Sequence, residues 1–263
     1  MRLEGKVIVI IGGTTGMGLS ASQAFVKEGA WIVIVGRDPQ DADRAIQLLG
    51  ADARSFVGDA TDPATAPKAI ELALREFGRF DGLYHVAGGS GRKHGDGPLH
   101  DISDAGWNFT LNLNLTSLFY SNRAAIQQFL KQETGGSILN IGSILSYSPS
   151  PHFFATHAYA AAKSAVIGLT KSSAAYYAAK NIRFNLLVPA LIETPMSERA
   201  VSNPEIMKFI HTKQPLDGGR VGSPSDLDGA ATFFMSDESR FVTGQVLAVD
   251  GGWSVSEGQI PID

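Results

Sequence analysis

The sequence predicts one α/β domain, built on a doubly wound parallel sheet with helices on both faces. Apolar runs typical of buried strands alternate with helical segments along the whole chain, which favours right-handed crossovers between parallel strands. The length of 263 residues suits a single domain, and no repeat or low-complexity linker divides it. Hydrophobic residues make up 44% of the chain and charged residues 18%, a composition that can bury a large core.

The composition also narrows the classes of partner and site. A net charge of -4 gives no electrostatic reason to expect nucleic acid or a membrane surface as a partner. The chain has no cysteine, and His94 and His100 lack a ligand constellation, so we expect no metal site. No apolar run approaches the ~18 residues of a membrane span, and the N-terminus lacks a signal-peptide core. We therefore expect a cytoplasmic protein.

Seven short apolar runs are typical of buried strands, and helical patterns lie between them. The strands are expected at Val7–Ile11, Trp31–Val35, Arg54–Val57, Leu83–Val86, Ser137–Ile141, Ile182–Val188 and Val246–Val249. The helices are expected from the glycine turn to about Glu28, and at Asp41–Leu49, Asp62–Phe77, Ser103–Gln132, Thr156–Lys180 and Ser223–Met235. Residues 190–222 are expected to form a lid of loops and short helices over a cleft.

The first predicted strand runs into a glycine-rich turn, Gly12–Gly18, which opens a helix. In this context glycines allow a phosphate to approach the backbone, and the helix N-terminus offers free N–H groups. The spacing is G-x-x-x-G-x-G, and a purely structural glycine turn is the alternative interpretation. The context favours a nucleotide site.

The end of the second predicted strand bears on the choice of nucleotide. In a nucleotide-binding βαβ unit these residues contact the adenosine ribose, and an acidic residue there binds the free 2′-hydroxyl. This chain has Gly36 at that position and Arg37 after it, and a guanidinium can hold a 2′-phosphate. Asp38 could instead pair with Arg37, or Arg37 could simply be solvated. We predict a preference for NADP over NAD.

Tyr159 and Lys163 are four residues apart on a predicted helix, so they share one face. The pKa of a tyrosine hydroxyl is normally ~10, and a neighbouring ammonium group lowers it by favouring the phenolate. The pair could therefore move a proton at neutral pH. Ser143 follows a buried strand, at the edge where open α/β sheets place ligand contacts. Alone, the pair also fits a packing tyrosine and a solvated lysine. Its weight comes from the other unusual residues expected along the same edge.

These motifs together resemble the short-chain dehydrogenase/reductase family in its single-domain form, over essentially the whole chain. The resemblance implies a Rossmann fold. The matching positions are Gly12–Gly18, Asp59, His85–Gly88, Asn114, Ser143, Tyr159, Lys163, Pro189–Thr194, Gly244–Val246 and Val249–Gly252. Asn114 fits the family's active-site asparagine better than Asn112.

The resemblance implies an NAD(P)-dependent oxidoreductase that transfers a hydride between a nicotinamide cofactor and a carbonyl or alcohol substrate. Tyr159 would be the acid/base, and Ser143 would hydrogen-bond the substrate oxygen. Lys163 would lower the tyrosine pKa and hold the ribose, and Asn114 would anchor a relay water. The implied cofactor-binding residues are Gly12, Thr14, Thr15, Gly16, Met17, Gly18, Arg37, Asp59, Ala60, Ala87, Gly88, Tyr159, Lys163, Pro189, Ile192 and Thr194. A homo-oligomer, a tetramer or a dimer, is also implied.

The chain departs from the family pattern at a few positions. Ile11 replaces a threonine, His85 and Val86 replace two asparagines, and Ala190 replaces a glycine. Alanine does not readily adopt the positive φ that glycine allows. The segment between Ser143 and Tyr159 is longer than usual in the family, which leaves Ser146 as an alternative serine.

Two other functions remain open at this point: a nucleotide-sugar epimerase or dehydratase, and a non-catalytic dinucleotide-binding sensor. The former usually needs a larger substrate domain, and the four intact active-site residues argue against the latter. The substrate is not readable from the sequence, although aromatic residues near the cleft suggest an apolar or ring-bearing one. The candidate pocket residues are Ser90–Pro98, Tyr147, His152, Phe153, Phe154, Met196 and Phe209.

Overall fold

Seven parallel strands form the central sheet in the computed structural model, which describes residues 1–259. The strands are β1 Val7–Ile11, β2 Trp31–Gly36, β3 Ala53–Val57, β4 Gly82–His85, β5 Gly136–Ile141, β6 Ile182–Pro189 and β7 Val246–Val249. Their order in the sheet is β3-β2-β1-β4-β5-β6-β7, which confirms the predicted doubly wound α/β architecture. The strand order reverses direction at β1 and β4, so a crevice opens at the carboxyl ends of the strands there.

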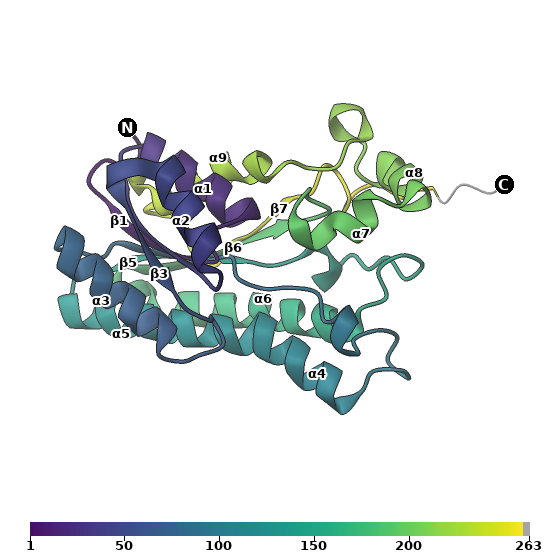
Figure 1. The fold of residues 1–263 in the computed structure, drawn as a ribbon, viewed down its shortest axis with the longest axis horizontal. Helices are drawn as coiled ribbons and strands as arrows, with labels where there is room; N and C mark the ends of the chain where they lie inside the picture. The colour runs from purple at the N-terminus through teal and green to yellow at the C-terminus, as the bar shows by residue number, and fades with distance from the viewer. Residues whose placement is uncertain (260–263) are drawn as a thin grey trace.

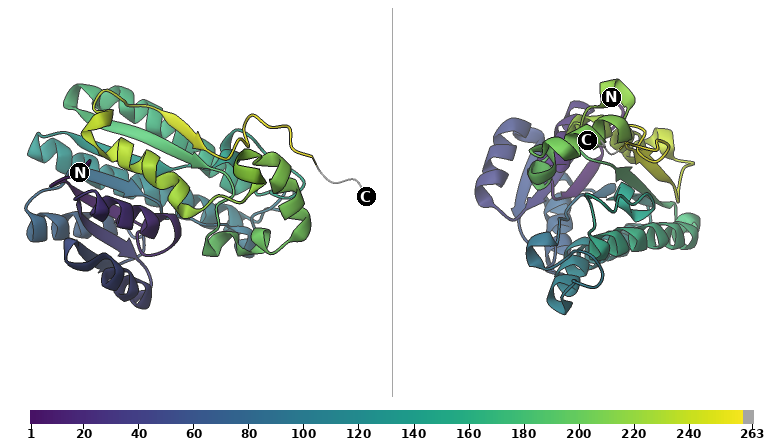
Figure 2. Two further views of the ribbon diagram at one scale, coloured as in Figure 1. Left: turned by 90° about the horizontal axis from the view of Figure 1, so that it is seen from above. Right: turned by 90° about the vertical axis from the view of Figure 1, so that its right-hand side faces the viewer.

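Helices cover both faces of the sheet (Figures 1 and 2). Residues of α1, α2 and α9 pack on one face, and residues of α3, α5 and α6 pack on the other. The helices are α1 Gly16–Lys27, α2 Pro39–Leu49, α3 Thr65–Phe77, α4 Asp104–Leu111, α5 Ser117–Gln132, α6 His157–Tyr177, α7 Glu198–Val201, α8 Pro204–Lys213 and α9 Asp228–Met235. None of the helices within residues 1–259 combines the length and apolarity of a membrane span.

The β1 strand shows why the sequence folds this way. All five of its residues are β-branched and buried, as expected for a strand covered on both faces. Because side chains alternate along a strand, Ile8 and Ile10 enter the core under α1 and α9, whereas Val9 and Ile11 enter the core under α3 and α5. A third apolar cluster surrounds Trp253 and holds α7 and α8 at the end of the sheet.

Several predicted helices differ from the structure. The helix expected at Ser223–Met235 begins as a 3₁₀ turn at Pro224 and is α-helical only from Asp228. The helix expected from Asp62 begins at Thr65, because the Asp62 carboxylate instead accepts a hydrogen bond from Ala64 N in a turn. The helix expected over residues 103–132 consists of α4, a π-helical stretch over residues 112–116, and α5. The α6 helix ends at Tyr177 and continues only as one 3₁₀ turn to Lys180.

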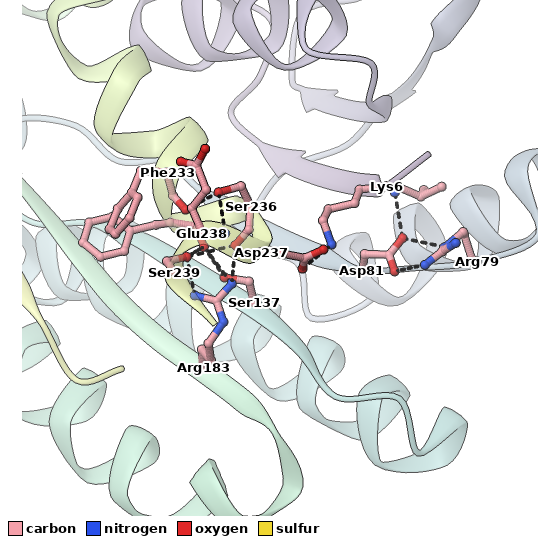
Figure 3. A network of polar contacts seen from close by, with 12 residues as sticks. Lys6, Arg79, Asp81, Ser137, Arg183, Phe233, Ser236, Asp237, Glu238 and Ser239 are labelled. Carbon is pink, nitrogen blue, oxygen red and sulfur yellow. Dashed lines mark hydrogen bonds and ion pairs between the residues drawn. The ribbon is translucent and has the colours of Figure 1, made fainter. Parts of the chain in front are cut away.

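Polar contacts cross the edge of the sheet opposite the crevice, at the amino ends of the strands (Figure 3). The Arg79 guanidinium donates two hydrogen bonds to the Asp81 carboxylate, at 2.7 and 2.8 Å, and Val7 N donates a third at 2.8 Å. The Arg183 guanidinium donates to Ser239 Oγ at 2.8 Å. The contacts of Asp81 join the starts of β1 and β4, and the Arg183 contact joins β6 to the chain that follows α9, so these contacts stabilise the fold at this edge.

Candidate active site

Three adjoining cavities form one crevice along the carboxyl ends of the strands. Their volumes are about 450, 90 and 140 Å³. Met196 lines all three, and Ser143 and Tyr159 line both the second and the third. The first and largest of the three lies over the glycine turn, the second lies beside Lys163, and the third extends toward α7.

The glycine turn is tight enough to require glycine. Gly12 has φ +88°, and a Cβ atom there would lie 2.7 Å from Ala87 N. A Cβ at Gly18 would lie 1.9 Å from the Gly12 carbonyl oxygen. Gly18 therefore allows α1 to approach the turn. It does not line the crevice, whereas all the other cofactor-binding residues that the resemblance implies do line it.

The start of α1 faces the largest cavity without a capping side chain. Its N-cap residue, Thr15, makes no side-chain cap bond, and the first turn contains no acidic residue. Free N–H groups and the positive end of the helix dipole are the features that bind a phosphate. The cavity of about 450 Å³ over this helix end therefore fits the pyrophosphate of a dinucleotide.

Arg37 lies at the far end of the largest cavity, exposed to solvent. The Asp38 carboxylate caps α2 by accepting from Gln40 N at 2.7 Å, and within residues 1–259 it makes no ion pair with Arg37. A Cβ at Gly36 would lie 2.2 Å from Thr14 Oγ1, so no longer side chain fits there in this conformation. Arg37 is thus the cationic side chain of this cavity, whose lining also includes the acidic Asp38, Asp41 and Asp59.

Asp59 lies across the same cavity, at the end of β3. Burial raises the pKa of its carboxyl group, but hydrogen bonds from Thr61 and the nearby Arg37 charge outweigh this effect and lower the pKa overall. Thr61 donates to Asp59 Oδ1 from both its N–H and its hydroxyl, each at 2.8 Å. Asp59 is therefore an ionised acceptor facing the cavity.

Tyr159, Ser143 and Lys163 meet where the second and third cavities join. Tyr159 and Lys163 lie on α6, and the Lys163 Nζ is 5.8 Å from the centre of the Tyr159 ring. Lys163 is buried and donates a hydrogen bond to the Ile141 carbonyl oxygen at 2.9 Å. Ser143 follows β5 directly, as predicted. The Ser146 hydroxyl instead donates back to the Ser143 carbonyl oxygen, and Ser146 lines none of the three cavities.

The protonation of this group differs in one respect from the sequence-based expectation. Burial raises the pKa of Tyr159, and its hydrogen bond with Ser143 only partly opposes that rise. The expected lowering of the tyrosine pKa by Lys163 is not seen, because the ammonium group of Lys163 points to the Ile141 carbonyl. Burial also lowers the pKa of Lys163 to about 8, so the Lys163 amine is still mostly protonated at pH 7.

Asn114 lies behind the crevice in the π-helical stretch Asn112–Thr116. Its side chain is fully buried, whereas Asn112 is exposed. Asn114 Oδ1 accepts from Gly89 N at 3.0 Å, and Nδ2 donates to the Gly89 and Thr110 carbonyl oxygens at 2.9 and 3.0 Å. Asn114 therefore positions the backbone that follows β4, and it lines none of the three cavities.

Comparison with known proteins identifies the family. A family model described as enoyl-(acyl carrier protein) reductase matches residues 12–254. The 2-(S)-hydroxypropyl-CoM dehydrogenase 3 of Xanthobacter autotrophicus is 34% identical over 258 residues, which cover 95% of this chain and 97% of that protein. The NADP-dependent (R)-specific alcohol dehydrogenase of Lentilactobacillus kefiri is 34% identical over 257 residues, which cover 96% and 98%.

A solved structure of a short-chain type dehydrogenase/reductase from Mycobacterium ulcerans superimposes with a TM-score of 0.89. It shares 30% identity, and the match covers 98% of this chain and 93% of that one. The chain belongs to the short-chain dehydrogenase/reductase family. It is therefore an oxidoreductase that uses a nicotinamide cofactor and a small-molecule substrate.

Two departures from the family pattern are explained by the structure. His85 is buried and pins the end of β4, because Nδ1 lies 2.7 Å from Ser121 Oγ and Nε2 lies 3.0 Å from the Ala87 carbonyl oxygen. Burial lowers the pKa of His85 to about 3, and the Lys163 charge contributes, so its imidazole is neutral. Ala190 is not among the residues with positive φ, so its turn is unstrained.

Sequence reasoning missed two buried residues that hold the site of this short-chain dehydrogenase in place. Asp96, in the loop after β4, accepts hydrogen bonds from Ala158 N and Tyr159 N, both at 3.0 Å, and so caps α6. Gln214, just after α8, accepts from Leu191 N at 2.9 Å and holds the segment that follows β6. Both residues act on chain that is remote in sequence, so no local pattern identifies them.

The third cavity contains only some of the predicted pocket residues. Ser90, Arg92, Phe154 and Met196 line it, whereas the rest of Ser90–Pro98 and Tyr147, His152, Phe153 and Phe209 do not. The Phe209 ring packs against Phe153 and Trp253, with ring centres 5.3 and 5.8 Å apart. Part of the aromatic content near the cleft is therefore lid packing. The sequence analysis did not single out two further lining residues, Arg199 and Trp253.

Proposed function

We propose that this enzyme interconverts a small carbonyl compound and its alcohol, prefers NADPH to NADH, and uses Tyr159 as the acid/base. The supporting observation is that Tyr159 lies at the junction of the second and third cavities, beside Ser143 and one helical turn from Lys163. When bound, the nicotinamide cofactor supplies or accepts the hydride. The protein orients the reactants and handles the proton.

Each side chain has a separate role in this proposal. In reduction, the Tyr159 hydroxyl gives its proton to the carbonyl oxygen, and in oxidation it takes the proton back. Ser143 donates a hydrogen bond to the same oxygen as negative charge develops there. The Lys163 ammonium group holds ribose hydroxyls of the cofactor. Because the Asn114 amide group is bonded to Gly89 and Thr110, we assign its main chain, not its side chain, to anchor a water molecule that exchanges the proton with solvent.

The raised pKa of Tyr159 suits the reducing direction. A buried tyrosine remains protonated at neutral pH, so it carries the proton that the carbonyl oxygen needs. For the oxidising direction a positive charge must approach the hydroxyl and favour the phenolate. Lys163 is the buried cation available on the same helix face, 5.8 Å from the ring centre.

The proposed cofactor preference depends on the end of β2. Arg37 faces the largest cavity without an ion pair among the described residues, and Asp38 is engaged as a helix cap. A guanidinium binds a phosphate through two parallel hydrogen bonds. One relative, the Lentilactobacillus kefiri enzyme, is named as NADP-dependent. The residues proposed to bind the cofactor are those implied by the family resemblance, except that Gly18 acts by shaping the turn.

The substitution Tyr159→Phe tests the catalytic role. It removes the hydroxyl and keeps the ring, so turnover should be lost while cofactor affinity stays within a few-fold of wild type. Steady-state rates on a panel of ketones and alcohols, and fluorescence titration with NADPH, measure the two effects. A variant that keeps about a tenth or more of the wild-type kcat would contradict the role, because a general acid typically contributes ~10²–10⁴-fold.

We also propose a homo-oligomer, either a tetramer or a dimer. Trp107, Phe109 and Phe119, on α4 and α5, are exposed large apolar side chains, and so is Leu247 on β7. Exposed apolar side chains that gather on one face are typical of subunit interfaces. Light scattering at micromolar concentration tests this proposal, and a monomer would refute it. The cytoplasmic location stays a prediction from the sequence.

A further inference from the structure

The third cavity contains two arginines that the reaction itself does not require. Arg92, in the loop after β4, and Arg199, on α7, both line the cavity of about 140 Å³ into which Ser143 and Tyr159 also face. We propose that the substrate carries an oxyanion group, such as a carboxylate, that Arg92 and Arg199 bind together. This inference rests on the proposed function, because it assigns this cavity to the carbonyl substrate.

The two guanidinium groups converge on one neutral acceptor. Arg92 donates to the Phe153 carbonyl oxygen at 3.3 Å, and Arg199 donates to the same oxygen at 3.5 Å. A single carbonyl oxygen does not neutralise two cations, and like charges at this separation repel each other. Burial lowers the pKa of Arg92, and the charge of Arg199 lowers it further. An anion in the cavity would remove this repulsion.

Asp96, the acidic side chain that acts on Arg92, can balance only one of the two arginine charges. Within residues 1–259 neither Arg92 nor Arg199 forms an ion pair, whereas Arg220 is paired with both Asp217 and Asp226. Asp96 is the acidic residue that acts on Arg92, and its two carboxylate oxygens are already bonded to main-chain N–H groups at the start of α6. The positive charge in the cavity is therefore available to a ligand.

The rest of the cavity indicates the form of the ligand. The other walls of this cavity are mainly apolar and include Ile144, Leu145 and Trp253. A short oxo acid or hydroxy acid has matching parts: a carbonyl or hydroxyl group at one end, a hydrocarbon segment, and an anionic group at the other end. Arginine pairs bind carboxylates and phosphates with geometric specificity as well as affinity.

The test compares each oxo carboxylate with its own methyl ester, so that the two compounds of a pair differ mainly in charge. The anionic substrates are 2-oxopentanoate, 4-oxopentanoate, 5-oxohexanoate and 3-oxobutylphosphonate, and the neutral ones are the methyl esters of the three carboxylic acids. Wild type, Arg92→Gln and Arg199→Gln are assayed for kcat/KM with NADPH. Arg240→Gln is the matched control, because Arg240 is exposed and lies at the opposite edge of the sheet.

We expect at least one anionic substrate to exceed its neutral form by about tenfold or more in kcat/KM, the size of one charge-assisted contact. Arg92→Gln and Arg199→Gln should each remove about tenfold of that advantage and leave the rate on neutral ketones within a few-fold. Preference for the phosphonate over the carboxylates would identify the oxyanion as a phosphate-like group. The Arg240→Gln control should match wild type on both classes.

The proposal is overturned if neutral ketones are reduced as efficiently as every anionic form, or if the two variants slow both classes equally. The first result would leave the oxidoreductase function intact. If no compound turns over, fluorescence titration with the same anions decides the matter. Saturable binding that Arg92→Gln and Arg199→Gln abolish supports the anion site, and the absence of such binding refutes it.

Discussion

The cap that Asp96 places on α6 leads to a quantitative prediction. The helix begins beside the catalytic tyrosine, and its own N-cap residue, Thr156, makes no side-chain cap bond. Asp96 supplies the missing acceptor from a loop 62 residues earlier in the chain, with one oxygen on Ala158 N and the other on Tyr159 N. Replacing Asp96 by asparagine leaves one acceptor oxygen and turns an NH₂ group toward the other N–H.

The expected loss is therefore one charge-assisted hydrogen bond and a weakened second one. A hydrogen bond to a charged group contributes ~1.5–3 kcal/mol, and loss of a helix cap costs ~0.5–2 kcal/mol. We expect Asp96→Asn to lower the free energy of unfolding by about 2 kcal/mol, which for a chain of this size shifts Tm by roughly 4–8 °C. We expect kcat to fall by about tenfold, because small displacements of a catalytic group are costly.

Calorimetry and steady-state kinetics at 25 °C, well below the melting transition, measure the two effects. Asp101→Asn is the matched control, because Asp101 is an exposed aspartate in the same loop and its carboxylate pairs with the exposed His100. A purely structural role would lower Tm and leave kcat at 25 °C unchanged. The reasoning is refuted if Asp96→Asn has the same Tm and kcat as the control. Asp96→Glu keeps the carboxylate and should recover part of kcat.

Two further predictions concern the proposed catalytic serine and the cofactor. Ser143→Ala should reduce kcat by roughly 10²–10³, the usual cost of one oxyanion-type donor, and Ser146→Ala should have a much smaller effect. The assignment of Ser143 is wrong if steady-state rates show that Ser146→Ala is the more damaging change. Arg37→Ala should weaken NADPH binding by at least about tenfold and barely change NADH binding, since a charge-assisted phosphate contact contributes ~1.5–3 kcal/mol. Equal affinity of the wild-type enzyme for both cofactors in a fluorescence titration would overturn this preference.

The elements that depend on local pattern could be predicted from the sequence. The β-branched run Val7–Ile11 forms a strand with the predicted boundaries, because five consecutive apolar residues are buried from both faces. The turn that follows it is equally local, since glycine is the residue that such a close backbone approach allows. The predicted residues at the carboxyl ends of the strands do lie along one crevice, because parallel strands bring these ends to one edge.

The features that could not be predicted depend on contacts between distant parts of the chain. The segment around Asn114 has the apolar spacing of an α-helix, and only the hydrogen bonds of its side chain to Gly89 show why a π-helical stretch is stabilised there. The protonation of Tyr159 was predicted from its distance to Lys163 along the helix. Burial of Tyr159 raises its pKa, and the Lys163 ammonium group donates to the Ile141 carbonyl oxygen; neither feature can be deduced from the helical spacing.

The loop between β4 and α4 carries Arg92 and Asp96 only four residues apart, and the two side chains act in different directions. Arg92 faces the third cavity, and Asp96 holds the start of α6. A change in the length or sequence of this loop would therefore alter substrate selection and catalytic alignment together. Loop grafting between related enzymes has to carry the aspartate along with the arginine.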